Sequence, residues 1–225
     1  MSFEYQLIRS RRRTLELRVY PDHRIEVRAP MRCSMRDINE FVNERRDWVE
    51  KRLNGFVAPV QQSTEERFSH GSEHYYLGNS FRLLLSTGRS KARFSDDALT
   101  LYVTDSADPS KVEKALDTWY RRQAQQYFSE RLDALFPAFA ARGFTVPPLT
   151  LRKMRSRWGS LLQRTGMTLN TELIKTPPHC IDYVVVHELC HLEHMNHGPG
   201  FKGLMTKMMP DWTQRKKELN QFQRI

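Results

Sequence analysis

The chain has 225 residues, of which 39% are hydrophobic and 28% are charged, a balance typical of a globular domain in water. It contains no run of 18 apolar residues and begins without an apolar signal core, so we expect no membrane span and a cytoplasmic location. Three widely spaced cysteines make no disulfide framework. The net charge of +10 favours anionic partners, including nucleotides or nucleic acid at a basic surface.

The first part of the chain carries a strand pattern and then a helix pattern. Apolar and polar side chains alternate over residues 4–30 and predict a β-hairpin whose second strand stops at Pro30. Ser34 is a suitable N-cap for a helix that we expect to end near Gly55. The apolar stripe of this helix follows a 3.6-residue repeat and includes Trp48, which we expect in the core rather than at a ligand site.

Residues 58–66 are polar and predict a loop, whereas residues 68–103 return to a strand pattern. A tight hairpin turn is expected at Gly78. His70 and His74 lie four residues apart, but in a strand-and-turn context where the geometry of helical metal ligands does not apply. We therefore expect solvated or structural roles for both histidines.

A long helix and a basic strand region come next. Asp108-Pro109-Ser110 predicts the start of a long helix with a broad apolar stripe, which ends before Pro137 or continues in broken form to Gly143. We expect this helix to pack against a later one. Residues 149–170 predict strands around a basic segment that contains Arg157 and Trp158. These two side chains are candidates for substrate contact. The alternative is that Trp158 lies in the core and Arg157 pairs with a carboxylate.

The most informative stretch begins at His187 and reads H-E-x-x-H, after mostly apolar residues at 181–186 that predict a buried helix. On a helix, His187 and His191 lie on one face about 6 Å apart along the axis, so both imidazoles can reach one zinc ion. Glu188 is turned about 100° from His187 and is placed to touch a metal-bound water. This arrangement predicts a zinc hydrolase, and the alternative is a chance match on a surface helix.

A catalytic zinc site needs a third protein ligand and one open position, and the candidates are His194 and His197. On a straight helix, His194 lies about 10 Å along the axis from His187, which is a long reach for a shared ion. His197 can fold back if the helix stops after His194 or Met195, and residues 198–200 supply a Gly-Pro-Gly turn. We therefore favour His197 as the third ligand.

Several segments together resemble the YgjP-like metallopeptidase family, whose relatives are the SprT-like zincins. The resemblance rests on Arg157-Trp158-Gly159-Ser160, Leu169-Asn170, Pro177-Pro178, the run from Asp182 to His191, Asn196-His197 and Phe201. It implies one metallopeptidase domain over residues 1–225, β-rich in 1–106 and zinc-binding in 107–225. It also implies a zincin-like α+β fold, with antiparallel β-hairpins packed on helices and an H-E-x-x-H active-site helix.

The resemblance further implies one zinc ion on His187, His191 and His197, with Glu188 as the general base. The family pattern has a cysteine after its Gly-Ser pair, where this chain has Leu161. A role for that cysteine therefore does not transfer to this chain.

We expect a zinc-dependent hydrolase that cleaves peptide bonds, in which Glu188 takes the proton of a zinc-activated water. Arg157, Trp158 and Tyr183 are candidates to bind the peptide or protein substrate, and Arg157 or Tyr183 to stabilise the oxyanion. One alternative is a nucleoside triphosphate pyrophosphatase, an activity associated with YgjP-like proteins, which would use the basic segment at 152–157 although no phosphate-cradling glycine loop is present. The other is a nucleic-acid-associated protease or binding protein that the positive charge guides to DNA or RNA.

Overall fold

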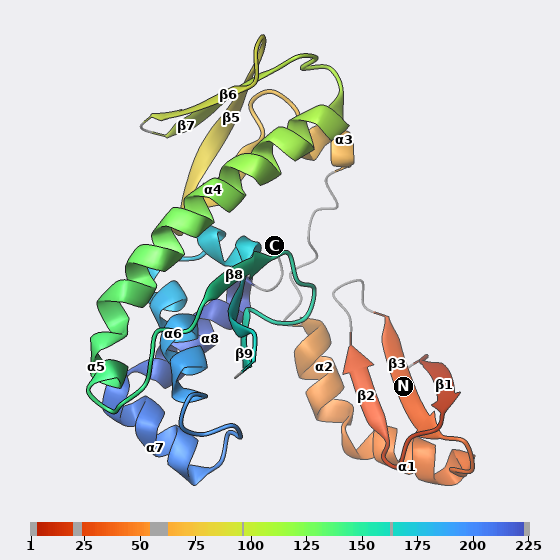
Figure 1. The fold of residues 1–225 in the computed structure, drawn as a ribbon. Coiled ribbons are helices and arrows are strands. Elements are labelled where there is room, and N and C mark those ends of the chain that lie inside the picture. The colour runs from red at the N-terminus through yellow and green to blue at the C-terminus, as the bar shows by residue number, and fades with distance from the viewer. Residues whose placement is uncertain (1–3, 20–23, 55–62, 96, 163, 223–225) are drawn as a thin grey trace. The chain divides into compact units, whose positions relative to one another are not determined.

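The computed structural model describes residues 4–19, 24–54, 63–95, 97–162 and 164–222 (Figure 1). The described residues fall into two compact units, one drawn from residues 1–61 and the other from residues 62–223. Both units combine helices with small sheets, which confirms the mixed α+β class. In the described part of the chain, no helix is both long enough and apolar enough to cross a membrane.

The first unit contains a three-stranded sheet in the order β1-β3-β2, formed by β1 (Gln6–Ser10), β3 (Ile25–Pro30) and β2 (Glu16–Val19). β2 and β3 pair antiparallel, which confirms the predicted hairpin and its end at Pro30. β1 pairs parallel to β3. Alternation within one segment does not reveal this pairing, because it depends on how the chain returns to the sheet.

Two helices, α1 (Met35–Glu44) and α2 (Arg46–Asn54), follow the sheet, and the prediction of one continuous helix is wrong. Ser34 caps α1 as expected, because its hydroxyl accepts a hydrogen bond of 3.1 Å from the Asp37 N–H. The chain leaves helical geometry at Arg45, where φ is −104° and ψ is 15°.

Only part of the expected apolar stripe of α2 is buried. Val49 is fully buried, whereas Trp48 is 48% exposed, so the prediction that Trp48 lies in the core is wrong. The buried positions Ile38, Val42 and Val49 keep helical spacings of four and seven residues, so Trp48 lies at the flank of the buried face. The helix end expected near Gly55 lies outside the described residues.

The second unit begins with α3 (Thr64–Arg67), a short helix in a segment predicted as loop. The correction has a local cause, since Ser63 and Glu66 form a reciprocal capping box with hydrogen bonds of 2.9 and 3.1 Å. The first residues of that predicted loop, 58–62, lie outside the described residues.

A four-stranded sheet follows, in the order β4-β5-β7-β6. Its strands are β4 (Glu73–Tyr76), β5 (Asn79–Thr87), β7 (Ala98–Val103) and β6 (Lys91–Ser95). β5 and β7 are parallel, and the two outer pairs are antiparallel. Gly78 makes the predicted turn between β4 and β5 at a φ of +85°, and a side chain there would lie 2.8 Å from Pro177.

Both histidines of this region have structural roles, as expected. His74 is only 6% exposed, and its Nε2 lies 3.2 Å from the Ser72 hydroxyl and 3.1 Å from the Arg67 carbonyl oxygen. His70 accepts a hydrogen bond of 3.1 Å from the Leu85 N–H. The His74 ring therefore ties β4 to α3, and the His70 ring ties the segment before β4 to β5.

The long predicted helix is α4 (Pro109–Leu135), capped by Asp108. Its first half buries Leu116 and Trp119 against the four-stranded sheet, and its second half contacts α6 (Pro178–Cys190). Figure 1 shows α4 running from that sheet to α6. This helix connects the sheet to the helix that carries the H-E-x-x-H residues.

A second three-stranded sheet has the order β8-β10-β9, with β8 (Leu149–Arg152), β10 (Gly166–Asn170) and β9 (Gly159–Leu162). β9 and β10 pair antiparallel as predicted, whereas β8 and β10 are parallel. Each described sheet thus contains a parallel pair, which corrects the expectation of antiparallel hairpins alone. The remaining elements are α5 (Pro137–Ala140), η1 (Thr171–Lys175), α7 (Pro199–Met208) and α8 (Trp212–Phe222).

Candidate metal centre

Helix α6 is the buried helix of the second unit. Pro178 lies in its first turn, where a missing N–H costs no hydrogen bond. Ile181, Val185 and Leu189 are fully buried, so apolar side chains cover most of its circumference. Arg131 of α4 holds the N-terminal half of α6 through two hydrogen bonds, of 2.6 and 3.0 Å, to the Asp182 carboxylate. The packing on α6 therefore fixes the helix that bears His187 and Glu188.

The helix ends earlier than predicted. Its last residue is Cys190 and its C-cap is His191, whereas we expected it to continue to His194 or Met195. The ring of His191 contributes to this end, since its Nδ1 lies 2.9 Å from the His194 carbonyl oxygen. The turn that follows brings the chain back toward α6.

Three imidazoles meet at this point. Ligand atoms of His187, His191 and His197 all lie within 4.8 Å of one another, and the three rings are 4.8 to 5.1 Å apart between centroids. The Nε2 atoms of His187 and His197 are 3.0 Å apart, close to the separation of about 3.3 Å expected for two nitrogens on one tetrahedral zinc ion. The fold thus brings together the three residues that the sequence predicted as ligands.

Phe201 and two further contacts hold the rings in place. The Phe201 ring lies 4.7 to 4.9 Å from all three imidazole centroids. The Nδ1 of His191 faces a carbonyl oxygen, which can only accept a hydrogen bond, so Nδ1 carries the proton and Nε2 keeps its lone pair. The Nδ1 of His187 is buried without a hydrogen-bond partner among the described residues, and the Tyr183 ring 5.7 Å away packs against this imidazole.

The second candidate ligand, His194, is not part of this group. Its backbone carbonyl faces His191, and its ring lies beside Gly200, where an added side chain would come within 2.8 Å of the ring. The His194 ring also lies 3.5 Å from the carboxylate of Glu193. Its contribution is thus to orient His191, and the preference for His197 over His194 agrees with the geometry.

The protonation state of the rings suits a cation. Burial, followed by the neighbouring rings of His191 and His197, lowers the pKa of His187 to about 3. Burial also lowers the pKa of His197. Neutral imidazoles offer lone pairs at neutral pH, and nitrogen donors in a group of three fit zinc. The residues present therefore fit the metal ion that this pattern implies.

Glu188 lies beside this group and is enclosed by strand β9. Its side chain is 5% exposed, and a side chain at Gly159 would come within 2.7 Å of its Oε1 atom. Burial raises the pKa of Glu188 to about 7, while the charge of Arg157 and a hydrogen bond from the Leu161 backbone N–H act in the opposite direction. A carboxyl group with a pKa near neutrality is suited to accept and release a proton.

The loop before β9 is held by Asn170, a residue to which the sequence analysis assigned no role. Asn170 is 4% exposed and its side chain makes four hydrogen bonds of 2.8 to 3.2 Å, to the backbone of Met154, Arg157 and Glu172. A buried polar side chain at the end of a predicted strand is the signal that could have pointed to this role.

The three predicted substrate residues lie in different surroundings. Arg157 is exposed, and Trp158 is partly buried against the core, with an Nε1 that has no hydrogen-bond partner among the described residues. Tyr183 is 5% exposed and packs on His187. Arg157 is thus the most accessible of the three.

The match to a known family agrees with this geometry. The family model described as YgjP-like, metallopeptidase domain, matches residues 13–222. The search of curated proteins gave no match. Among solved structures, the metallopeptidase zymogen of Methanocaldococcus jannaschii jannalysin is similar over 42% of this chain and 94% of that chain, at 15% identity and a TM-score of 0.37. The family match covers nearly the whole chain, which therefore belongs to the YgjP-like metallopeptidases, a family of metal-dependent hydrolases.

Proposed function

We propose that the protein is a zinc-dependent metallopeptidase that holds one zinc ion through His187, His191 and His197 on an H-E-x-x-H active-site helix of zincin type. The observation that carries this proposal is the meeting of three imidazoles beside a buried carboxyl group. When bound, zinc supplies a Lewis acid and lowers the pKa of water that it coordinates.

Glu188 is the general base in this proposal. It takes a proton from the attacking water and passes it to the nitrogen of the leaving amine. Its pKa of about 7 allows both transfers near neutral pH. The hydrogen bond from Leu161 and the contact with Gly159 hold the carboxyl group in one orientation.

Strand β9 is the proposed site for the peptide substrate. It is an edge strand of its sheet, and Leu162 is 57% exposed. An extended peptide can add to such an edge through main-chain hydrogen bonds. Arg157 and Trp158 precede the strand and are proposed to contact the substrate. Burial raises the pKa of Tyr183 to about 12, so its hydroxyl stays protonated and can donate to an oxyanion.

The experiment that tests this function combines metal analysis with hydrolysis of casein. The purified protein is expected to contain about one zinc per chain and to cleave casein. Glu188→Gln should keep the metal and lose turnover by about 100-fold or more. Glu193→Gln makes the same change in a side chain that pairs with Arg142 and should stay active. Full activity of Glu188→Gln would remove the general-base assignment.

Phosphoanhydride hydrolysis is the second candidate function. Arg152, Arg155 and Arg157 are exposed and have no ion-pair partner in the described part of the chain, and guanidinium groups suit phosphates. Release of pyrophosphate from nucleoside triphosphates, with casein left intact, would favour this activity over peptide cleavage. Loss of that activity in Glu188→Gln would assign it to the same site.

Nucleic-acid association stays a prediction that rests on the charge of +10. It requires binding to DNA or RNA that weakens steeply with salt. An absence of binding at low salt would exclude it.

We also propose that residues 1–225 form one catalytic domain. This proposal predicts that a chain beginning at residue 107, without the earlier residues, has no activity.

A further inference from the structure

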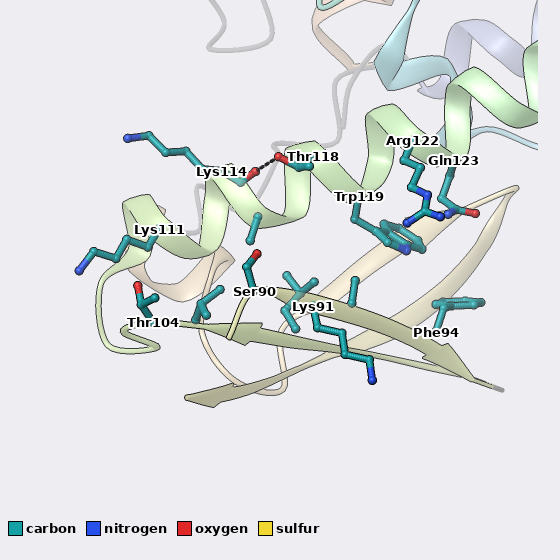
Figure 2. Close-up of a pocket in the computed structure, with 14 residues that line it drawn as sticks. Ser90, Lys91, Phe94, Thr104, Lys111, Lys114, Thr118, Trp119, Arg122 and Gln123 are labelled. Atoms are coloured by element: carbon teal, nitrogen blue, oxygen red, sulfur yellow. Dashed lines mark hydrogen bonds between the residues drawn. The ribbon is translucent and has the colours of Figure 1, made fainter. Parts of the chain in front are cut away.

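A groove lies between α4 and the strands β6 and β7, separate from the imidazole group. Its volume is about 790 Å³. Phe94, Leu101 and Val103 of the strands and Trp119 of the helix give it an apolar floor, and Phe94 is 40% exposed. Figure 2 shows Trp119, Arg122 and Gln123 on α4, with Lys91 and Phe94 on the opposite side.

The wall of the groove is a sheet edge. β6 is the terminal strand in the order β4-β5-β7-β6, and all five of its residues are exposed. Among the described residues, no strand pairs with its outer side. Part of its backbone N–H and C=O groups therefore face solvent and can accept another strand.

The lining is positively charged. Lys91, Lys111, Lys114 and Arg122 line the groove, and no described carboxylate does. Lys111 is neutralised by Asp105 and Asp108, at 3.2 and 3.6 Å. The other three cations have no ion-pair partner in the described part of the chain. An occupant of this groove must therefore bring negative charge.

We propose that this groove binds an extended, acidic segment of a partner protein, which adds as a strand to β6. Its main chain pairs with the free edge, its apolar side chains lie on Phe94 and the floor, and its carboxylates pair with Lys91, Lys114 and Arg122. A nucleic acid would also meet the cations. It would, however, leave the N–H and C=O groups of the edge without a strand partner, so the free edge favours a polypeptide.

This binding does not depend on hydrolysis. The groove uses the part of α4 from residue 111 to residue 123, whereas α6 is tied to Arg131. Trp119 and Arg131 are about 18 Å apart along the helix axis. Peptide binding can therefore be measured in the Glu188→Gln variant. The result tests the groove independently of the peptidase assignment.

The test measures the fluorescence anisotropy of a labelled peptide of alternating glutamate and valine, added to the full chain. Arg122→Glu is expected to weaken binding about tenfold or more, since it removes a charge-assisted hydrogen bond. Arg121→Glu is the matched control, because Arg121 is the adjacent, exposed arginine outside the groove. It should change affinity less than about twofold. Thermal unfolding verifies that both variants fold.

Two further probes separate the edge from the charge. The same peptide with every backbone nitrogen methylated should lose binding, because neither of its edges can donate hydrogen bonds to β6. Equal loss in Arg121→Glu and Arg122→Glu would overturn the proposal, as would an unchanged affinity of the N-methylated peptide. The proposal would also be overturned if an oligothymidylate bound, depended on Arg122 and the peptide did not bind. The groove would then be a nucleic-acid site.

Discussion

Gly159 lies so close to Glu188 that a methyl group at residue 159 would come within 2.7 Å of the Glu188 Oε1 atom. Two residues further along β9, the Leu161 backbone N–H hydrogen-bonds to the same carboxylate. The strand therefore acts on this carboxyl group in two ways, by a contact that limits its movement and by a bond that aligns it. Both depend on the separation between β9 and α6.

The first prediction concerns that contact. Gly159→Ala should displace the Glu188 carboxyl group or push β9 away from α6, and kcat for casein hydrolysis should fall by about tenfold or more. Zinc content should stay at the wild-type level, since no imidazole moves. Gly203→Ala is the control, because an added methyl group there meets no atom within 4 Å. Wild-type kcat in Gly159→Ala would contradict the positioning of Glu188 by this strand.

The second prediction distinguishes the two histidines that follow the helix. His197→Ala removes one of three grouped nitrogens and should lower zinc affinity by about 100-fold or more. His194→Ala should retain zinc, because the interaction with His191 uses the backbone carbonyl of residue 194 and not its ring. Competition with a chromophoric chelator measures both affinities. Equal losses in the two variants would contradict the proposed ligand set.

Local sequence patterns predicted the features that local geometry determines. The spacing of His187 and His191 follows from one helical repeat, and the fold brings them together as expected. The Gly-Pro-Gly segment after them predicted a return of the chain, and His197 does return. The place where α6 ends was missed, because it depends on the contact between the His191 ring and the carbonyl of His194.

Features that depend on distant residues could not be predicted in this way. Trp48 lies on the expected apolar stripe, yet it is 48% exposed, because the buried face follows Val42 and Val49 and leaves Trp48 at its flank. The pairing of β1 beside β3 brings together segments whose alternation says nothing about their neighbours. In the sequence, Asn170 is a polar residue at the end of a predicted strand. In the structure, its side chain forms hydrogen bonds with residues up to 16 positions earlier in the chain. For β1 and for Asn170 the deciding contacts are nonlocal.

The third prediction follows from the hydrogen bonds of Asn170. Its Nδ2 donates to the carbonyl oxygens of Met154 and Arg157, at 2.8 and 3.0 Å. Asn170→Asp replaces these two donors with acceptors, so it should lower the free energy of unfolding by about 3 kcal/mol or more. Urea denaturation measures the change. Thr168→Ser, a small change at a partly buried position of the same strand, should cost far less. A wild-type stability of Asn170→Asp would mean that the loop is held by other contacts.

The last prediction concerns the pH dependence of stability. His74 packs between the rings of Phe68 and Phe81, at centroid distances of 6.4 and 5.8 Å. Burial, followed by the charge of Lys175, lowers the pKa of His74 to about 4, although the Arg67 carbonyl acts in the opposite direction. An unfolded chain holds this proton with a pKa of about 6.5. The unfolded state therefore binds more protons between these two values.

The sign of the effect follows from this difference. The contribution of His74 to stability is fully present above about pH 6.5 and is lost as the pH falls toward about 4, by up to about 3 kcal/mol. His74→Gln cannot titrate in this range, so its free energy of unfolding should fall less steeply with acidification than that of the wild type. Urea denaturation at a series of pH values gives the free energy of unfolding as a function of pH for each variant. If this free energy falls equally steeply in His74→Gln and in the wild type, burial of the His74 ring does not contribute to the loss of stability in acid.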